Sequence, residues 1–503
     1  MKQITRSFRL RQRRTFAVWE GIMALTILPV WYIAAASLPQ PELPALRVSV
    51  DGRGLTTVAG RPVFLLADTA WSLALRLNRD DAEFYLETRK RQGFNAVTFV
   101  LFAPGRSELT DSLANAYGDL PFEMDADRPD PARPITTPGA AAHDAIQYDY
   151  WDHVDHLISV SRRLGLYAII LPTWGTGIAG SYDGKNRQDI VFTVENAGRY
   201  GAWLAGRYGS EPHVLWMMGG DRSAVVDGND YRPAVRAMAS ALRRGAPTAL
   251  ISYHPRKGAP QSAAWFHDDE WLAFNSNQEW PDQQVRCISE DWARTPAKPT
   301  WLFEGRYEGY WRGNYKAEQW GEWQVRQQAY QTIFAGGFGH TYGHERVFGF
   351  GYDKADWKQY METPGVRSVT HLARLMSYLS PDELQARAPD QTLVSGDNPK
   401  PERLRSAYVA ALRTTAAGKV MFYTAAGRRV SAQLDRLPDG EYFAFWFNPR
   451  DGSWARETES AAEPIWFARG VRAGPGASLQ VFVPPTQGDG QDWVLILSRS
   501  DRL

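Results

Sequence analysis

Two acidic side chains follow apolar runs that have the composition of buried strands. Asp221 ends the run "HVLWMMGGD", and Glu304 ends the run "PTWLFE". A pair of carboxyl groups can hydrolyse a glycosidic bond when one stays protonated to assist the leaving oxygen and the other stays ionised. Taken alone, Asp221 also fits a turn residue or a helix N-cap, and Glu304 fits a structural ion pair with Arg306. The choice depends on the elements that position the two residues.

Aromatic and hydrogen-bonding side chains stand at the ends of the other apolar runs. Aromatic rings can stack on the apolar faces of sugars, while histidine and amide groups can bind hydroxyls. The candidate substrate-binding residues are Asp68, Trp71, Trp174, His254, Gln278, Arg306, Tyr307, His340, Tyr342 and His344. His340 and His344 have the spacing of a zinc pair on a helix, but the segment "GGFGHTYGHE" is glycine-rich and supplies no third ligand. We therefore expect neither a metal site nor a cofactor.

The apolar runs alternate with amphipathic helical patterns such as "RDDAEFYLETRKRQG". The runs cover residues 61–71, 93–102, 166–174, 213–221, 248–255, 271–280, 299–305 and 336–345. About eight repeats of strand and helix over roughly 320 residues predict an α/β fold of the (β/α)8 TIM barrel type. A doubly wound open sheet is the alternative, but no glycine-rich phosphate loop follows the first run. In a barrel the carboxyl ends of the strands meet at one mouth, so the candidate residues would converge there.

One loop of the predicted barrel is unusually long. Residues 103–147 follow the second strand and contain the Pro- and Asp-rich stretch "DADRPDPARPITTPG". Long loops inside compact domains are usually functional. We expect this loop to form a wall of the pocket at the barrel mouth.

The two ends of the chain differ from the barrel in composition. The segment "MKQITRSFRLRQRR" is basic and precedes a largely apolar stretch, so residues 1–38 are predicted to be a signal peptide or an N-terminal membrane anchor. Either alternative places the rest of the chain outside the cytoplasm, in the periplasm or anchored to the inner membrane. Residues 47–385 would form the barrel. Short alternating segments with Gly, Pro and Asp turns predict a small antiparallel β-sandwich domain over residues 390–503.

Charge and cysteine content exclude some classes of protein. The net charge of +1 gives no electrostatic footprint for nucleic acid, so no nucleic-acid partner is expected. The single cysteine, Cys287, rules out an internal disulfide framework.

Five blocks follow one another along the chain: "FLLADTAWSL", "RRLGLYAIILPTWG", "LWMMGGD", "AAWFHDDEWLAFNSNQ" and "KPTWLFEGRYEG". Together they resemble glycoside hydrolase family 140, the apiosidase-like family. The resemblance implies a (β/α)8 barrel followed by a β-domain labelled collagen-binding. It also implies that Asp221 is the acid/base and Glu304 the nucleophile. The chain departs from the family pattern at Phe303 and Gly305, where the family usually has Gly and Pro, and in the sixth-strand segment "SNQEWPD".

Two functions follow from these observations. The first is a retaining glycosidase that cleaves a plant or bacterial polysaccharide outside the cytoplasm, with the Asp221–Glu304 pair as its catalytic machinery. The alternative is a membrane-anchored accessory protein that binds an exopolysaccharide during export without hydrolysing it. The carboxyl pair ringed by aromatic residues favours the enzyme.

Overall fold

The computed structural model describes residues 43–258, 260–310, 319–396, 398–399, 406–414, 418–456 and 459–503. The predicted signal peptide or anchor, residues 1–38, lies outside this part of the chain. No helix among the described residues is both long enough and apolar enough to span a bilayer. Residues Glu42–Leu503 form one compact unit.

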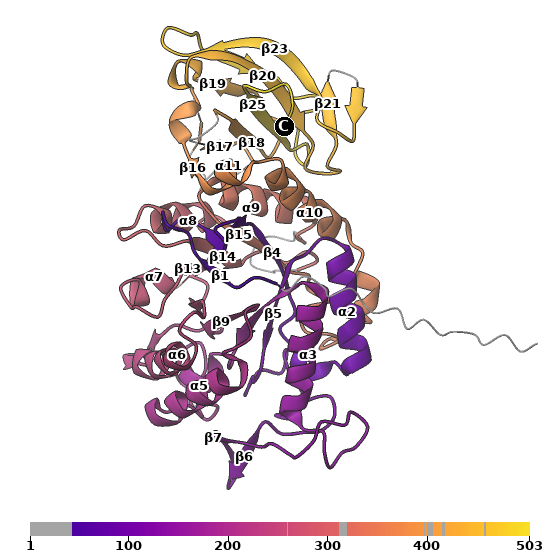
Figure 1. The fold of residues 1–503 in the computed structure, drawn as a ribbon, viewed down its shortest axis with the longest axis vertical. Coiled ribbons are helices and arrows are strands. Elements are labelled where there is room, and N and C mark those ends of the chain that lie inside the picture. The colour runs from indigo at the N-terminus through magenta and orange to yellow at the C-terminus, as the bar shows by residue number, and fades with distance from the viewer. Residues whose placement is uncertain are drawn as a thin grey trace, which may run out of the picture. The chain divides into compact units, whose positions relative to one another are not determined.

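Eight parallel strands form the first part of this unit (Figure 1). They are β4 (Leu65–Thr69), β5 (Ala96–Val100), β8 (Tyr167–Leu171), β9 (Val214–Gly219), β12 (Ile251–His254), β13 (Asn275–Gln278), β14 (Thr300–Glu304) and β15 (Gly339–Tyr342). Six of them pair in the order β12-β9-β8-β5-β4-β15, and β13 pairs with β14. Parallel bridges from Ile251 to Leu272 and from Thr300 to Gly337 join the two groups. The ring is therefore closed, which confirms the predicted (β/α)8 barrel and excludes the open sheet.

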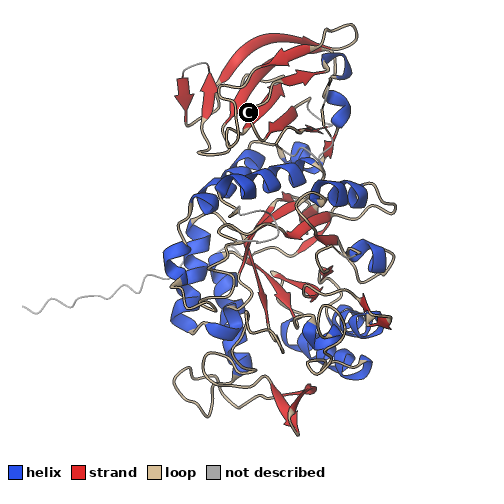
Figure 2. Cartoon of the chain, turned by 180° about the vertical axis from the view of Figure 1, so that it is seen from behind, coloured by secondary structure: helices blue, strands red, loops and turns tan. Residues whose placement is uncertain are grey.

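Helices surround the strands on the outside of the ring, as Figure 2 shows from behind. They are α1 (Leu73–Arg76), α2 (Arg79–Arg91), α3 (Tyr150–Leu164), α4 (Thr176–Ala179), α5 (Val194–Tyr208), α6 (Arg232–Gly245), α7 (Ser262–Phe266), α8 (Gln284–Trp292), α9 (Glu322–Phe334), α10 (Pro364–Ser377) and α11 (Pro381–Gln385). Local signals set their ends. In α3, for example, the Asp149 carboxylate caps the backbone N–H groups of Trp151 and Asp152, and Gly165 ends the helix in the left-handed conformation.

The barrel region also contains short strands that form separate small sheets. They are β1 (Leu46–Val48), β2 (Leu55–Thr57) and β3 (Pro62–Val63) before β4, the hairpin β6 (Phe122–Asp125) and β7 (Arg128–Pro134), and the hairpin β10 (Val225–Val226) and β11 (Asn229–Asp230). The β6–β7 hairpin lies within the long loop after β5, so part of that loop has regular structure.

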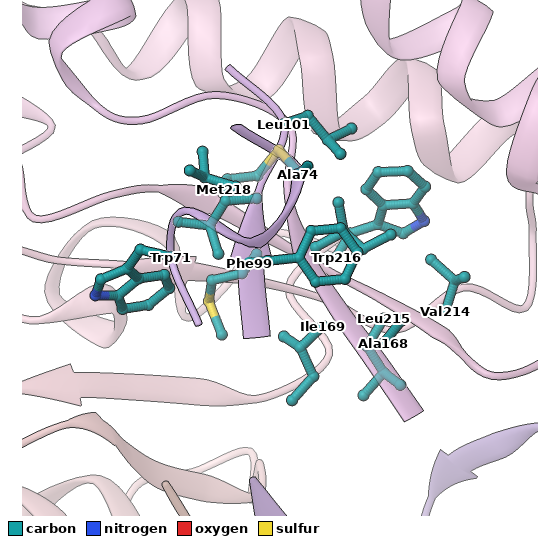
Figure 3. Close-up of a cluster of buried hydrophobic side chains, with 14 of the residues drawn as sticks. Trp71, Ala74, Phe99, Leu101, Ala168, Ile169, Val214, Leu215, Trp216 and Met218 are labelled. Carbon is teal, nitrogen blue, oxygen red and sulfur yellow. The ribbon is translucent and has the colours of Figure 1, made fainter. Parts of the chain in front are cut away.

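The barrel strands are buried on both faces because side chains alternate between the barrel interior and the helix layer. Every residue of β5, β8 and β9 is buried. Phe99, Ile169 and Trp216 of these neighbouring strands belong to one cluster of apolar side chains, part of which Figure 3 shows. This continuous burial explains why the strands are nearly unbroken apolar runs in the sequence.

An antiparallel β-domain follows the barrel. Its larger sheet has the order β16 (Arg387–Pro389), β17 (Val409–Thr414), β18 (Val420–Thr424), β25 (Trp493–Ser498), β20 (Gly440–Phe447), β21 (Trp454–Arg456) and β22 (Glu459–Ala461), and β23 (Trp466–Ala473) pairs with β20. A second sheet pairs β19 (Val430–Ala432) with β24 (Gln480–Phe482). The antiparallel fold predicted for this region is confirmed.

The large sheet of the β-domain is also buried on both faces. Along β18, Val420 and Phe422 belong to an apolar cluster inside the β-domain. Met421 and Tyr423 belong to a different cluster that includes side chains of α9 and α10. The β-domain therefore packs directly on barrel helices.

The β4 residue Asp68 corrects one sequence prediction. We expected it to bind substrate, but its side chain is fully buried between β4 and α2. It accepts hydrogen bonds from Arg89 Nε and Tyr85 Oη, each at 2.5 Å. Asp68 therefore joins a strand to its helix and does not face the barrel mouth.

Replacing Asp68 by Ala is expected to lower the free energy of unfolding by about 3–5 kcal/mol, because the buried Arg89 guanidinium would lose its carboxylate. Urea unfolding followed by tryptophan fluorescence measures the change. The Glu195→Gln variant serves as a control, since it breaks an exposed pair with Arg199 and should hardly affect unfolding. Equal, small effects from both substitutions would contradict the prediction.

Candidate active site

A cavity of about 490 Å³ opens where the barrel strands end. Six of the predicted site residues line it: Trp71, Trp174, Asp221, Gln278, Glu304 and Tyr307. They follow or end β4, β8, β9, β13 and β14, so the barrel brings together residues that are far apart in the sequence.

The Glu304 carboxylate is held by hydrogen bonds to both of its oxygens. His254 Nε2 lies 2.7 Å from Oε2, and Tyr307 Oη donates to Oε1 at 2.9 Å. Trp71 Nε1 in turn donates to Tyr307 Oη at 2.8 Å. The carboxylate at the end of β14 is thus oriented by residues from β4, β12 and its own loop.

The Gly-Gly-Asp turn after β9 explains why a carboxyl group follows two glycines. Gly219, Gly220 and Asp221 have successive φ values of 80°, 130° and 50°. A Cβ on Gly219 would lie 2.5 Å from the carbonyl oxygen of His254, and one on Gly220 would lie 2.8 Å from the Gly175 nitrogen. Only glycine fits these close approaches. The left-handed backbone at Asp221, which is rare for a residue with a side chain, is a form of strain found at functional sites.

A tyrosine and its arginine neighbours surround Asp221. Tyr182 Oη donates to the Asp221 carboxyl, and Arg222 Nη1 lies 3.8 Å from it. The Arg222 guanidinium also lies 3.7 Å from the centre of the Tyr182 ring, and that of Arg256 lies 4.8 Å from it. These cation–π contacts fix the tyrosine that orients Asp221.

The two carboxyl groups have pKa values that move in opposite directions. Burial, and then the nearby charge of Glu304, raises the pKa of Asp221 above its ordinary value. Burial also disfavours ionised Glu304, but the His254 hydrogen bond and charge, the Lys257 charge and the Tyr307 hydrogen bond outweigh it and lower the pKa of Glu304. When the pair holds a single proton, this arrangement places it on Asp221 and leaves Glu304 ionised.

Several predicted substrate-binding residues do not line the cavity: Asp68, His254, Arg306, His340, Tyr342 and His344. His254 is fully buried behind Glu304 and acts on it directly. Arg306 donates to the carbonyl oxygen of Gln324 in α9.

Residues of β15 and the loop after it face other neighbours. Tyr342 Oη donates to Glu308 Oε2 at 2.5 Å. His340 is buried, with no hydrogen-bond partner for either ring nitrogen among the described residues. His344 accepts a hydrogen bond from the Arg346 N–H. None of the three lines the cavity, so the structure gives no support to the substrate-binding role expected for them.

The sequence did not indicate a second group of cavity-lining residues. They are Arg106, Glu108, Leu109, Tyr182, Arg256, Lys257, Trp280, Tyr310, Trp320, Glu345, Phe348 and Tyr352. The first three belong to the long loop after β5, so that loop forms part of the wall as expected. The only sequence signal for the remaining aromatic residues after β13, β14 and β15 is the density of such residues there, and nothing in the sequence marked Tyr182, Arg256 and Lys257, which follow β8 and β12.

The described part of the chain contains no candidate group of side chains for binding a metal ion. No group of three or more His, Cys, Asp and Glu side chains there could hold a metal ion.

A protonated and an ionised carboxyl group in a cavity at the mouth of a (β/α)8 barrel can carry out glycoside hydrolysis, and the fold and site define a glycoside hydrolase. Comparison with known families agrees. Residues 49–381 match the apiosidase-like catalytic domain, and residues 388–498 match a domain described as the collagen-binding domain of a collagenase. The chain belongs to the apiosidase-like family, which confirms the resemblance seen in the sequence.

Solved structures of glycoside hydrolases share this architecture. A family 5 glycoside hydrolase from Bacteroides vulgatus is 27% identical, with a TM-score of 0.73 over 90% of this chain and 93% of that chain. Another structure, described as a glycoside hydrolase, is also 27% identical, with a TM-score of 0.75 over 92% of this chain and 98% of its own. No curated protein sequence matches the chain.

The Gly220→Ala substitution is expected to displace Asp221 and to lower the melting temperature. The new Cβ would meet the Gly175 backbone nitrogen at 2.8 Å in a left-handed conformation that costs a residue with a side chain about 1–3 kcal/mol. Thermal unfolding and a crystal structure of the variant would test this.

Gly228→Ala is the matched control, because Gly228 also has a positive φ, of 74°, but has no heavy atom near the position of a Cβ. The control should be destabilised less and should leave Asp221 in place. An undisturbed Asp221 in the Gly220 variant would contradict the prediction.

Proposed function

We propose that the protein is a retaining glycosidase that acts on a polysaccharide, with Asp221 as the acid/base and Glu304 as the nucleophile. The observation that carries this proposal is that Asp221 and Glu304 line one cavity with different partners. Their pKa values move in opposite directions as a result, which favours one group as proton donor and the other as nucleophile. Each group is held by its own tyrosine, Tyr182 for Asp221 and Tyr307 for Glu304.

The reaction follows from these protonation states. In the first step, Asp221 transfers its proton to the glycosidic oxygen as the bond from that oxygen to the anomeric carbon breaks. A Glu304 oxygen forms a bond to the same carbon, which gives a glycosyl–enzyme ester and the free alcohol. In the second step, ionised Asp221 removes a proton from water, and the water oxygen attacks the anomeric carbon. This releases the sugar, Glu304 as a carboxylate and Asp221 in its starting protonated form.

The cavity lining supports a carbohydrate substrate. Trp71, Trp174, Trp280, Tyr310 and Trp320 all line it, and such rings can stack on sugar faces. Tyr310 and Trp320 are themselves stacked, with ring centres 5.7 Å apart. A plant or bacterial polysaccharide is the proposed substrate class.

The N-terminal sequence supports a place of action outside the cytoplasm. Its basic segment followed by an apolar stretch has the pattern of an export signal or anchor. An exported enzyme would meet polymeric carbohydrate directly, so the proposed location and the proposed substrate are consistent.

An activity screen tests the function. The chain from about residue 40 onward would be incubated with plant-pectin and bacterial exopolysaccharide substrates, and released sugars would be measured by chromatography. We expect the wild type to release sugar. Glu304→Gln should lose at least about a thousandfold in kcat, and Asp221→Asn should lose activity most on substrates with poor leaving groups.

The two variants also separate the enzyme from the accessory-protein alternative. Full activity in both variants would refute the assignment of the pair. Binding of a polysaccharide by the wild type without release from any substrate, and unchanged binding by Glu304→Gln, would favour the export accessory.

His254→Gln is expected to move the pH profile of kcat/KM upward. Loss of the His254 hydrogen bond and charge raises the pKa of Glu304, so the acid limb, below which Glu304 is protonated and inactive, shifts to higher pH. The alkaline limb should shift less, because only the charge of His254 acts on Asp221.

The profile would be measured on whichever substrate the screen identifies. His213→Gln is the control, since His213 is buried but bonds to the Ile158 carbonyl oxygen, away from the cavity. Its limbs should not move. An unmoved acid limb in His254→Gln would show that His254 does not set the ionisation of Glu304.

A further inference from the structure

Helix α9 is buried and yet unusually polar. Its sequence "EWQVRQQAYQTIF" contains Arg326, Gln327, Gln328 and Gln331, none of which is more than 6% exposed. Buried polar side chains lower stability unless they are hydrogen-bonded. The partners of these side chains therefore show what the helix connects.

One side of α9 holds the loop that follows Glu304. Gln328 Oε1 accepts a hydrogen bond from the Arg306 backbone N–H at 2.5 Å. The Arg306 side chain donates to the Gln324 carbonyl oxygen and to Gln327 Oε1, each at 2.9 Å. Three hydrogen bonds from little more than one turn of α9 thus fix Arg306, two positions after the proposed nucleophile.

The fit between this loop and α9 is tight. A Cβ on Gly305 would lie 2.3 Å from Gln328 Nε2, so the glycine lets the loop lie directly against the glutamine side chain. The chain then reaches Tyr307, whose hydroxyl returns to Glu304 Oε1. Arg306 is therefore the anchored residue between the two partners of the Glu304–Tyr307 hydrogen bond.

The other side of α9 is bound by the β-domain. Arg326 Nη2 lies 2.9 Å from Asp492 Oδ1, and Arg326 Nε lies 3.1 Å from Asp492 Oδ2. The two side chains are 1% and 0% exposed. A bidentate pair of this kind fixes orientation as well as distance. Tyr423 of β18 also donates to Asp492, and its ring stacks on Tyr330 of α9 with centres 4.9 Å apart.

We infer that the β-domain positions the nucleophile through α9, with Asp492 and Gln328 as positioning residues for Glu304. This inference rests on the proposed role of Glu304. The path runs from Asp492 to Arg326, two residues along the helix to Gln328, and from there to Arg306 and the Glu304–Tyr307 hydrogen bond. The β-domain is then a working part of the hydrolase and not only an attached binding module.

The experiment measures how well the Arg306 amide is protected from exchange in the full chain. Hydrogen exchange followed by mass spectrometry reports the protection of the Arg306 amide in a peptide spanning residues 300–310. We expect exchange about tenfold faster in Gln328→Leu, which loses the acceptor, and wild-type protection in Gln328→Glu, which keeps one. Asp492→Asn and Arg326→Lys, which disturb the bidentate pair, should also speed exchange.

The control is a second buried ion pair between the β-domain and the rest of the chain. Lys419 Nζ lies 2.9 Å from Glu383 Oε2 of α11, and neither residue belongs to α9. Glu383→Gln should lower the melting temperature as Asp492→Asn does, but it should leave the Arg306 amide protected. Equal protection in Asp492→Asn and Glu383→Gln would overturn the inference.

Kinetics provide the second readout. In Gln328→Leu and Asp492→Asn we expect kcat to fall about ten- to a hundredfold with little change in KM, because the nucleophile is misplaced while the sugar still binds. The acid limb should also move to higher pH as the Tyr307 hydrogen bond to Glu304 weakens. An unmoved acid limb and unchanged kcat would overturn the inference. An inactive wild type would refute the proposed function, and hydrogen exchange would then decide the coupling by itself.

Discussion

The proposed chemistry depends on holding Glu304 as an ionised carboxylate although its side chain is only 14% exposed. Burying a charge costs several kcal/mol unless hydrogen bonds replace its hydration. Here His254 and Tyr307 supply those bonds, and Trp71 fixes Tyr307. These residues come from β12, from the loop after β14 and from the segment after β4, so the site exists only when the barrel is closed. The ionisation of the proposed nucleophile therefore depends on the same strand arrangement that closes the barrel.

The surroundings of the other carboxyl group, Asp221, favour its protonated form. Asp221 stands on a strained turn, and within the described segments its carboxyl accepts a hydrogen bond from Tyr182 alone, with Arg222 further off at 3.8 Å. Fewer stabilising contacts leave the effect of burial dominant, so the group favours its protonated form. Two chemically similar side chains at the same barrel mouth thus acquire different roles from their surroundings. The strained backbone at Asp221 is tolerated because the preceding Gly220 is held by two hydrogen bonds, from its N–H to the His254 carbonyl oxygen and from the Gly175 N–H to its carbonyl oxygen.

The sequence was sufficient to predict the barrel and the position of Asp221 and Glu304 at its mouth. The strands are continuous apolar runs, since both of their faces are buried, and residues that end such runs must meet at the mouth. It was not sufficient to tell which strand-end side chains face the cavity. Asp68 looked equivalent to Asp221, but its partner, Arg89, lies on the following helix and draws the carboxylate outward. That distinction depends on a tertiary ion pair, which periodicity does not encode.

The same limitation applies to the loops and to the β-domain. Tyr182 and Arg106 reach the cavity from irregular segments, where no repeating pattern marks a residue as inward-facing. In the β-domain, the run "VMFYT" of β18 is buried at every position, which differs from the alternation expected of a sheet with one face in water. A strand that is buried on both faces must pack against other elements on each side, and on one side of β18 these elements are barrel helices. Helix α9 is one of them, and it also holds the loop after Glu304. The burial of β18 is therefore linked to the geometry of the proposed catalytic carboxylate.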